Sequence, residues 1–125
     1  MKVLLSIKPK YVKEIFFGNK RYEYRKKIFK NVDIDTVIVY SSSPVKKVVG
    51  QFRISEIIED NPSNIWEYTK EYSGIDKTDY YKYFEGRDKG FAIKIMETEV
   101  YERPMELKEF RSDLEYPPQS FMYIY

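Results

Sequence analysis

The sequence predicts an α+β domain in which mixed or mostly antiparallel strands form a small β-barrel with two or three short helices at its flanks. Successive strand patterns are interrupted by only brief helical patterns, which is typical of such folds. The chain has 125 residues, of which 42% are hydrophobic, enough for one core and about one domain. No repeat, low-complexity tract or linker is visible. Residues 1–125 are therefore expected to form a single domain.

Six segments have the apolar pattern of strands. Met1–Ile7 contains the run VLLSI, which indicates a buried strand. The other five are rich in β-branched or aromatic residues and are Lys20–Phe29, Asp35–Ser41, Val45–Ile58, Gly90–Met96 with an extension through Tyr101, and Phe121–Tyr125. With the helices below, the expected order is β-α-β-β-β-α-α-β-β.

Three helices are expected from their start and stop signals. The first begins at Pro9, a residue suited to the first helical turn, and ends at Gly18. The second follows the turn Asp60–Ser63, runs through Trp66 to Tyr72 and is expected to pack Trp66 against the barrel, with a base-stacking lid as the alternative. The third covers Lys77–Phe84 and ends at Gly86.

The composition excludes several classes of site. The chain has no Cys and no His, so disulfides, thiolate or imidazole metal sites and His-containing triads are impossible. No clustered carboxylates suggest a metal site, and neither a metal nor a cofactor is expected. No apolar run approaches the ~20 residues of a membrane span, and the opening seven residues lack the features of a signal peptide. A cytoplasmic protein without a membrane partner is expected.

Charge is segregated along the chain although the net charge is only +2. Residues 8–30 hold nine basic and two acidic residues, whereas residues 55–85 hold eight acidic and three basic ones. The basic segment is interleaved with Tyr11, Tyr22 and Tyr24, a pattern that suits phosphates and stacked bases. Two alternatives stay open: the segments face each other, or the charges are merely solvated.

The most informative stretch is Gly18–Arg25, with the sequence GNKRYEYR. In a strand, Lys20, Tyr22 and Tyr24 share one face, while Arg21, Glu23 and Arg25 share the other. Lys20 suits a phosphate contact or, if burial lowers its pKa, the role of a base. Arg25 is suited to a bidentate contact with a phosphate or a carboxylate. Glu23 can accept a hydrogen bond from the exocyclic amine of a base. For Glu23 and Arg25 we favour a structural role, as a buried or half-buried ion pair that fixes the wall of a cleft.

Gly18, Lys20, Glu23 and Arg25 match the GxKxxExR signature of the ASCH domain, a branch of the PUA-like superfamily. The opening strand and helix, the YSSSP stretch ending at Pro44, and the closing stretch Pro118–Phe121 also resemble this family, so the resemblance covers essentially the whole chain. It implies a small barrel with a cleft beside the signature strand. Relatives use that cleft for RNA, nucleotides or a modified base; some resemble regulators of transcription or translation, and a few are amidohydrolases or ribonucleases.

We therefore expect an RNA- or nucleotide-binding domain that recognises a base and a phosphate in this cleft. The residues expected to line it are Ser6, Lys8, Lys20, Glu23, Arg25, Ser42 and Gln119. Ser42 lies in a hydroxyl-rich turn, which is alternatively just a turn. Gln119 sits beside Phe121, a combination that reads and stacks a base, or alternatively marks a strand entry made rigid by proline.

Two other functions stay open. The first is a small hydrolase, either a nucleoside amidohydrolase or a ribonuclease, in which Lys20 and Glu71 form the acid–base pair. The amidohydrolase relatives use a Lys, a Thr and a Glu; Lys20 and Glu71 match two of these, while Glu23 replaces the Thr and lacks its hydroxyl. The second is a protein-interaction module whose acidic helices contact a partner.

Overall fold

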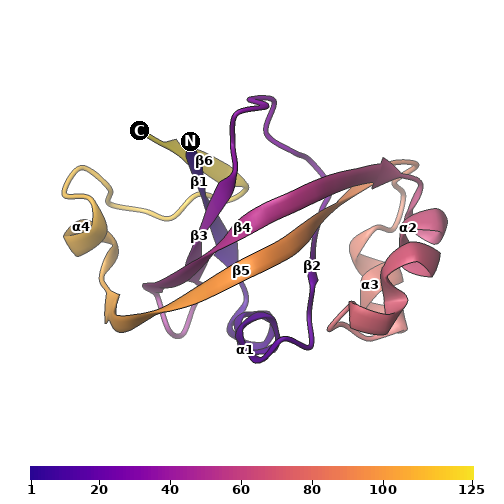
Figure 1. Cartoon of the computed structure of the whole chain (residues 1–125), viewed down its shortest axis with the longest axis horizontal. Coiled ribbons are helices and arrows are strands. Elements are labelled where there is room, and N and C mark those ends of the chain that lie inside the picture. The colour runs from indigo at the N-terminus through magenta and orange to yellow at the C-terminus, as the bar shows by residue number, and fades with distance from the viewer.

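The computed structural model describes all residues, 1–125, as one curled mixed sheet with helices along it (Figure 1). The strands have the order β2-β5-β4-β3-β1-β6. Their bounds are β1 Lys2–Ile7, β2 Tyr22–Arg25, β3 Thr36–Ser41, β4 Lys47–Asp60, β5 Gly90–Met105 and β6 Phe121–Ile124. Strands β1 and β3 are parallel, and the other pairs are antiparallel. This confirms the predicted α+β class and mixed sheet.

The sheet is not closed into a barrel, so this part of the sequence prediction is wrong. Strands β2 and β6 are the two edges, and no strand pairing joins them. The long β4–β5 ribbon carries three register shifts, and such bulges bend the paired strands. The sheet consequently curls, and the side chain of Arg25 crosses from β2 to the backbone before β6.

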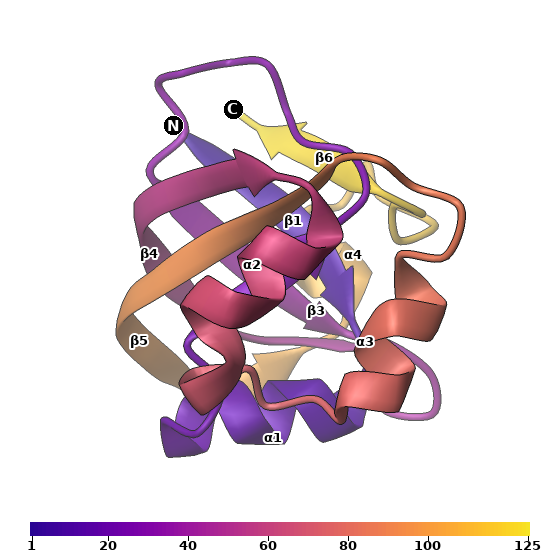
Figure 2. The same ribbon diagram turned by 90° about the vertical axis from the view of Figure 1, so that its right-hand side faces the viewer.

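The helices lie at different places on the curled sheet (Figures 1 and 2). Helix α1 runs beneath it, α2 and α3 lie together at one end of the β4–β5 ribbon, and α4 lies at the other end. Their bounds are α1 Pro9–Phe17, α2 Pro62–Thr69, the 3-10 helix η1 Lys70–Tyr72, α3 Lys77–Tyr83 and α4 Leu107–Phe110. No helix is long and apolar enough to span a membrane.

Local sequence signals account for the helix ends. Helix α1 has Pro9 in its first turn and ends at Gly18, whose φ of 88° is the left-handed conformation that glycine adopts readily. The side chain of Asn61 accepts a hydrogen bond from the backbone N–H of Asn64 and caps α2. Helix α4 was not predicted; Glu106 and Glu109 form a reciprocal capping box at its start.

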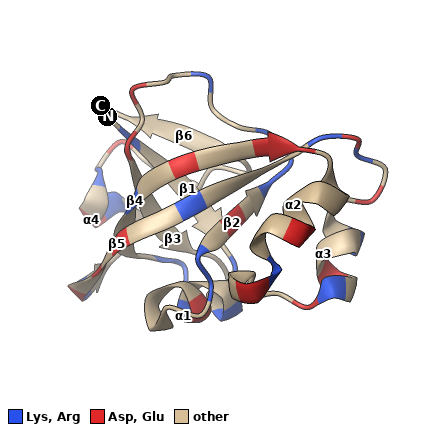
Figure 3. Cartoon of the chain, turned by 45° about the vertical axis from the view of Figure 1, so that its right-hand side comes forward, with Lys and Arg blue, Asp and Glu red and all other residues tan.

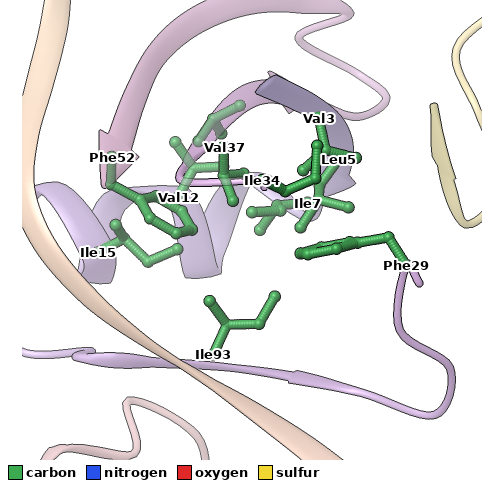
Figure 4. Close-up of a cluster of buried hydrophobic side chains, with 11 residues drawn as sticks. Val3, Leu5, Ile7, Val12, Ile15, Phe29, Ile34, Val37, Phe52 and Ile93 are labelled. Atoms are coloured by element: carbon green, nitrogen blue, oxygen red, sulfur yellow. The ribbon is translucent and has the colours of Figure 1, made fainter. Parts of the chain in front are cut away.

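The main core lies between α1 and the sheet (Figure 4). Val12 and Ile15 of α1 face apolar residues of the central strands, such as Val37 and Phe52. All six residues of β3 are buried because the strand is covered on both faces. A second cluster includes Leu107 and Leu114 on the opposite face. The buried side chains supply the apolar contact that holds the curled sheet in shape.

The third cluster fixes α2 and α3 on the sheet. Trp66 is 8% exposed and packs against Tyr80, with 4.8 Å between ring centroids. Tyr24 of β2 meets Tyr80 edge-on at 4.9 Å. The Tyr24 hydroxyl shares a 2.7 Å hydrogen bond with the Thr69 hydroxyl. Trp66 therefore packs α2 on the sheet, as the sequence predicted, and β2 is anchored to both helices.

The expected strand Lys20–Phe29 is shorter in the structure. Only Tyr22–Arg25 pairs with β5, and the chain then leaves the sheet. Phe29 is nonetheless 6% exposed and packs edge-on against Phe121 at 5.9 Å. The apolar residues after Arg25 thus pack into the core from a loop. Their apolar pattern in the sequence is the same as that of a strand, so the sequence alone could not distinguish the two.

Candidate functional site

One cavity, with a volume of about 570 Å³, lies between α1, β2, α3 and the segment before β6. This volume is within the range of about 300–1,000 Å³ that is usual for small-molecule sites. Most of its lining side chains are polar or charged. They are Ser6, Ile7, Lys8, Lys10, Tyr11, Lys20, Glu23, Tyr24, Arg25, Ile75, Asp79, Lys82, Tyr83 and Gln119.

The structure brings together six of the seven residues predicted to line the cleft. Ser6, Lys8, Lys20, Glu23, Arg25 and Gln119 all border this cavity, although they come from opposite ends of the chain. Strand β2 pairs with β5 only, so its other edge is free. Side chains from both faces of β2 line the cavity, Tyr24 from one and Glu23 and Arg25 from the other, together with Lys20 just before the strand.

Arg25 joins the two edges of the sheet. Its Nη2 donates to the Ser120 carbonyl at 2.6 Å, and its Nη1 donates to the Ser6 carbonyl at 3.5 Å. The same Nη1 pairs with the Glu23 carboxylate at 3.3 Å. Both side chains of this ion pair are largely buried, with 13% and 9% of their surface exposed. The predicted Glu23–Arg25 pair in the cleft wall is present.

Lys20 is the most deeply buried cation of the cavity. Only 2% of its surface is exposed, and its Nζ donates a 2.9 Å hydrogen bond to the Ser73 carbonyl. The same atom lies 4.5 Å from the centroid of the Tyr24 ring and 5.2 Å from that of Tyr11. Burial lowers the pKa of Lys20 to about 8, against the opposing influence of the Glu23 charge.

One hydrogen bond, between Ser6 and Pro118, holds Ser6 and Gln119 together in the cavity wall. The Ser6 hydroxyl donates to the Pro118 carbonyl at 2.8 Å, which ties β1 to the segment before β6. Gln119 follows directly and is exposed. Lys8, immediately before α1, is also exposed. Both can therefore contact a molecule that enters from solvent.

Ser42 and Glu71, two further predicted site residues, do not line the cavity. The backbone N–H of Ser42 donates to the Ile7 carbonyl at 2.9 Å, and its side chain stays outside. Glu71 is exposed on η1, whereas the next two residues, Tyr72 and Ser73, contact Arg21 and Lys20 through their carbonyls. The carboxylates that share the cavity with Lys20 are Glu23 and Asp79.

The sequence analysis missed the contribution of α3 and part of α1. Asp79, Lys82 and Tyr83 have the three- and four-residue spacing of one helix face, and all three line the cavity. Lys10 Nζ lies 3.9 Å from the Asp79 carboxylate, an ion pair that joins the basic and acidic segments at this site. The spacing on α3 was visible in the sequence, but the position of that face opposite β2 was not.

Positive charge predominates in the cavity. Five cations line it, namely Lys8, Lys10, Lys20, Arg25 and Lys82, against the two carboxylates of Glu23 and Asp79. Figure 3 shows basic residues on α1 and α3, the two helices that border the cavity. Tyr83 adds a ring whose hydroxyl accepts a hydrogen bond from the Lys26 backbone at 3.2 Å. Burial raises the pKa of Tyr83, so its hydroxyl stays protonated near neutral pH.

Comparisons with known proteins agree with this architecture. An ASCH domain-containing ribonuclease of Zymomonas mobilis is 27% identical over 97% of the chain and 82% of its own length. The crystal structure of ASCH from Zymomonas mobilis superposes with a TM-score of 0.90 at 27% identity, over 99% of this chain and 87% of that one. The N-terminal domain of Staphylothermus marinus McrB, at 13% identity and a TM-score of 0.58, shares the fold over 90% of this chain and 80% of that one.

The chain also resembles part of a larger protein. It is 30% identical, over 98% of its length, to the large ribosomal subunit protein uL22 of Ureaplasma parvum, and it spans 39% of that protein. Residues 5–104, which include the whole Gly18–Arg25 signature, match the ASCH domain. The chain belongs to the ASCH domain family.

Proposed function

We propose that this ASCH domain is a ribonuclease that binds single-stranded RNA with one base in the cavity. The observation that carries the proposal is the lining of the cavity, which combines five cations with three tyrosine rings. Cations contact phosphates and aromatic rings stack bases, so this combination suits a nucleotide strand. The similarity to a ribonuclease of Zymomonas mobilis supports RNA as the substrate.

The binding contacts differ in depth. Lys8 and Lys10 are exposed at the start of α1 and suit phosphates that remain near solvent. Glu23 is mostly buried beside Arg25 and suits an amino group of a base that enters the cavity. Arg25 already has three acceptors, so it contributes by holding Glu23 and the cavity wall.

Lys20 is the proposed base of the cleavage step. With a pKa of about 8, about one tenth of the Lys20 side chains are neutral at pH 7. The neutral amine takes the proton of a ribose 2′-hydroxyl, the 2′-oxygen bonds to phosphorus, and the bond to the 5′-oxygen breaks as that oxygen takes a proton from solvent. The products are a 2′,3′-cyclic phosphate and a 5′-hydroxyl.

The proposal is tested by incubating single-stranded RNA oligomers with the protein and separating the products by chromatography. We expect RNA to be cleaved, the same sequence with 2′-deoxy sugars to stay intact, and Lys20→Met to lose at least a hundredfold in rate. Lys94→Met is the matched control, because Lys94 is exposed on β5 and does not line the cavity. Equal cleavage of the deoxy oligomer, or full activity of Lys20→Met, would contradict the proposal.

RNA binding without cleavage is the second candidate. It is favoured by the contacts of Lys20, since the Ser73 carbonyl and two tyrosine rings also stabilise the charged ammonium. In that case the protein binds the RNA oligomers, leaves them intact and acts as a regulator. The same experiment separates the two candidates. A protein partner for the acidic helices stays a prediction.

A further inference from the structure

Lys20 is held from one side by the segment Lys70–Asp76, which comprises η1 and the turn after it. The backbone N–H of Arg21 donates to the Tyr72 carbonyl at 2.8 Å, and Lys20 Nζ donates to the Ser73 carbonyl at 2.9 Å. The Arg21 guanidinium carbon lies 4.0 Å from the centroid of the Tyr72 ring. Three contacts thus join this segment to the two residues that precede β2.

Gly74 lies directly against Lys20. Its φ of 62° is in the left-handed region, and a methyl group at this position would lie 2.9 Å from Lys20 Cα and closer still to Lys20 Cβ. Only hydrogen fits there. The turn itself is fixed, because the Ser73 hydroxyl donates to the Ile75 carbonyl at 3.1 Å and Ser73 is 5% exposed.

We infer that the Ser73–Gly74 turn is a positioning element for Lys20, and that Gly74 is required for the ammonium to reach its buried place in the cavity. The turn lies directly against Lys20 and offers its ammonium one neutral acceptor, the Ser73 carbonyl. A role of the Ser73–Gly74 turn in RNA cleavage rests on the proposed function. Its effect on the position of the Lys20 ammonium does not.

The other groups around Lys20 come from different elements. Glu23 and Tyr24 belong to β2, and Tyr11 belongs to α1. The other charged groups that line the same cavity are Lys8, Lys10, Arg25, Asp79 and Lys82. A second cavity that Lys20 also lines contains Arg21 and Glu97. Displacement of the turn leaves these groups in place but admits water to Lys20. The expected result is a higher pKa for Lys20, since burial is the main cause of its lowering.

The test compares Gly74→Ala with Gly86→Ala. Gly86 has a φ of 78°, so both substitutions strain the backbone alike, but no neighbouring atom lies within 4 Å of a methyl group at position 86. The pH titration of the Lys20 side chain is followed by NMR in the lysine-labelled 125-residue protein, with Lys20→Met to assign the signal. We expect a midpoint near 8 in the wild type and in Gly86→Ala, and a midpoint at least one pH unit higher in Gly74→Ala.

A titration of Gly74→Ala that coincides with that of Gly86→Ala would overturn the inference. If Gly74→Ala does not fold, Ser73→Ala removes only the hydroxyl that fixes the turn, and a smaller shift in the same direction is expected relative to the exposed control Thr78→Ala. The absence of any shift in Ser73→Ala would then overturn it. Failure of the wild type to cleave RNA would refute the proposed function and leave this titration result intact.

Discussion

Lys20 is a charged side chain that folding removes almost completely from water. One hydrogen bond and two ring faces replace its hydration, and its pKa falls from 10.5 to about 8. A lowered lysine pKa means that the charged form is less stable in the folded protein than in the unfolded chain. The residue therefore costs stability near neutral pH, which is typical of groups placed for binding or chemistry rather than for folding.

Replacement of Lys20 by Met is expected to raise the free energy of unfolding at pH 7 by about 2 kcal/mol. A pKa lowered from 10.5 to about 8 corresponds to roughly 3 kcal/mol, and the unsatisfied Ser73 carbonyl left in the variant offsets about 1 kcal/mol of that. The gain is measured by urea unfolding monitored by circular dichroism.

The pH dependence of this gain has a definite sign. Between about pH 8 and pH 10.5 the folded wild type has released the Lys20 proton while the unfolded chain still holds it, so wild-type stability rises with pH. The advantage of Lys20→Met should therefore shrink as the pH rises from 8 to 10. A difference that is constant over this range would show that Lys20 titrates normally.

At the scale of elements, the open edge of the sheet is the decisive feature. Strand β2 has four residues and one neighbour, and β6 has four residues and one neighbour. Closure of a complete barrel would fill the space between them with hydrogen bonds. Here the Arg25 guanidinium bridges the gap, so a cavity remains beside it.

We expect Arg25→Ala to loosen β6 without unfolding the sheet. The substitution removes the donors to Ser120 and Ser6 and leaves Glu23 without its partner. Amide hydrogen exchange in Phe121–Ile124 should become at least tenfold faster, while exchange in the buried strand β3 stays unchanged. Arg25→Lys should restore little, because an ammonium cannot reach two carbonyls as a planar fork does.

The control for this prediction is Arg87→Ala, since Arg87 is exposed in the loop before β5. Its removal should leave the exchange of β6 as in the wild type. Unchanged exchange of β6 in Arg25→Ala would show that β1 pairing alone holds the strand.

For the molecule as a whole, the fold gathers basic side chains of a nearly neutral chain around one positively charged cavity. Cations from α1, β2 and α3 converge there, although the net charge is only +2. Local charge of this kind attracts a polyanion without making the entire protein basic.

Binding of single-stranded RNA is therefore expected to weaken with salt. If Lys8, Lys10 and Lys82 neutralise about three phosphates, the logarithm of affinity should fall with that of salt with a slope of about −2, or roughly 20-fold between 50 and 200 mM. Fluorescence anisotropy in graded KCl measures this slope. Lys10→Ala should reduce it by about 0.7, and Lys94→Ala should not change it; a slope that is zero, or equally sensitive to both variants, would contradict binding at this cavity.

The sequence by itself determined the elements and the key motif of this protein. Strand-like apolar patterns located the six strands, Pro9 and Gly18 bounded α1, and the signature Gly18–Arg25 identified the family and the strand beside the site. These features depend on residues that are near one another in the chain. The short helix α4 was not predicted from the sequence, because its capping signal, Glu106 and Glu109, is short and directly follows a long strand.

Only the tertiary structure decided how the site is completed. Packing of α3 against β2 brings Asp79, Lys82 and Tyr83 to the cavity, and the Ser73 carbonyl to Lys20 across 53 residues of chain. The tertiary structure also leaves the sheet open and places Glu71 outside the cavity. Such contacts depend on how elements that are far apart in the sequence pack against one another. A local pattern of residues carries no information about that packing.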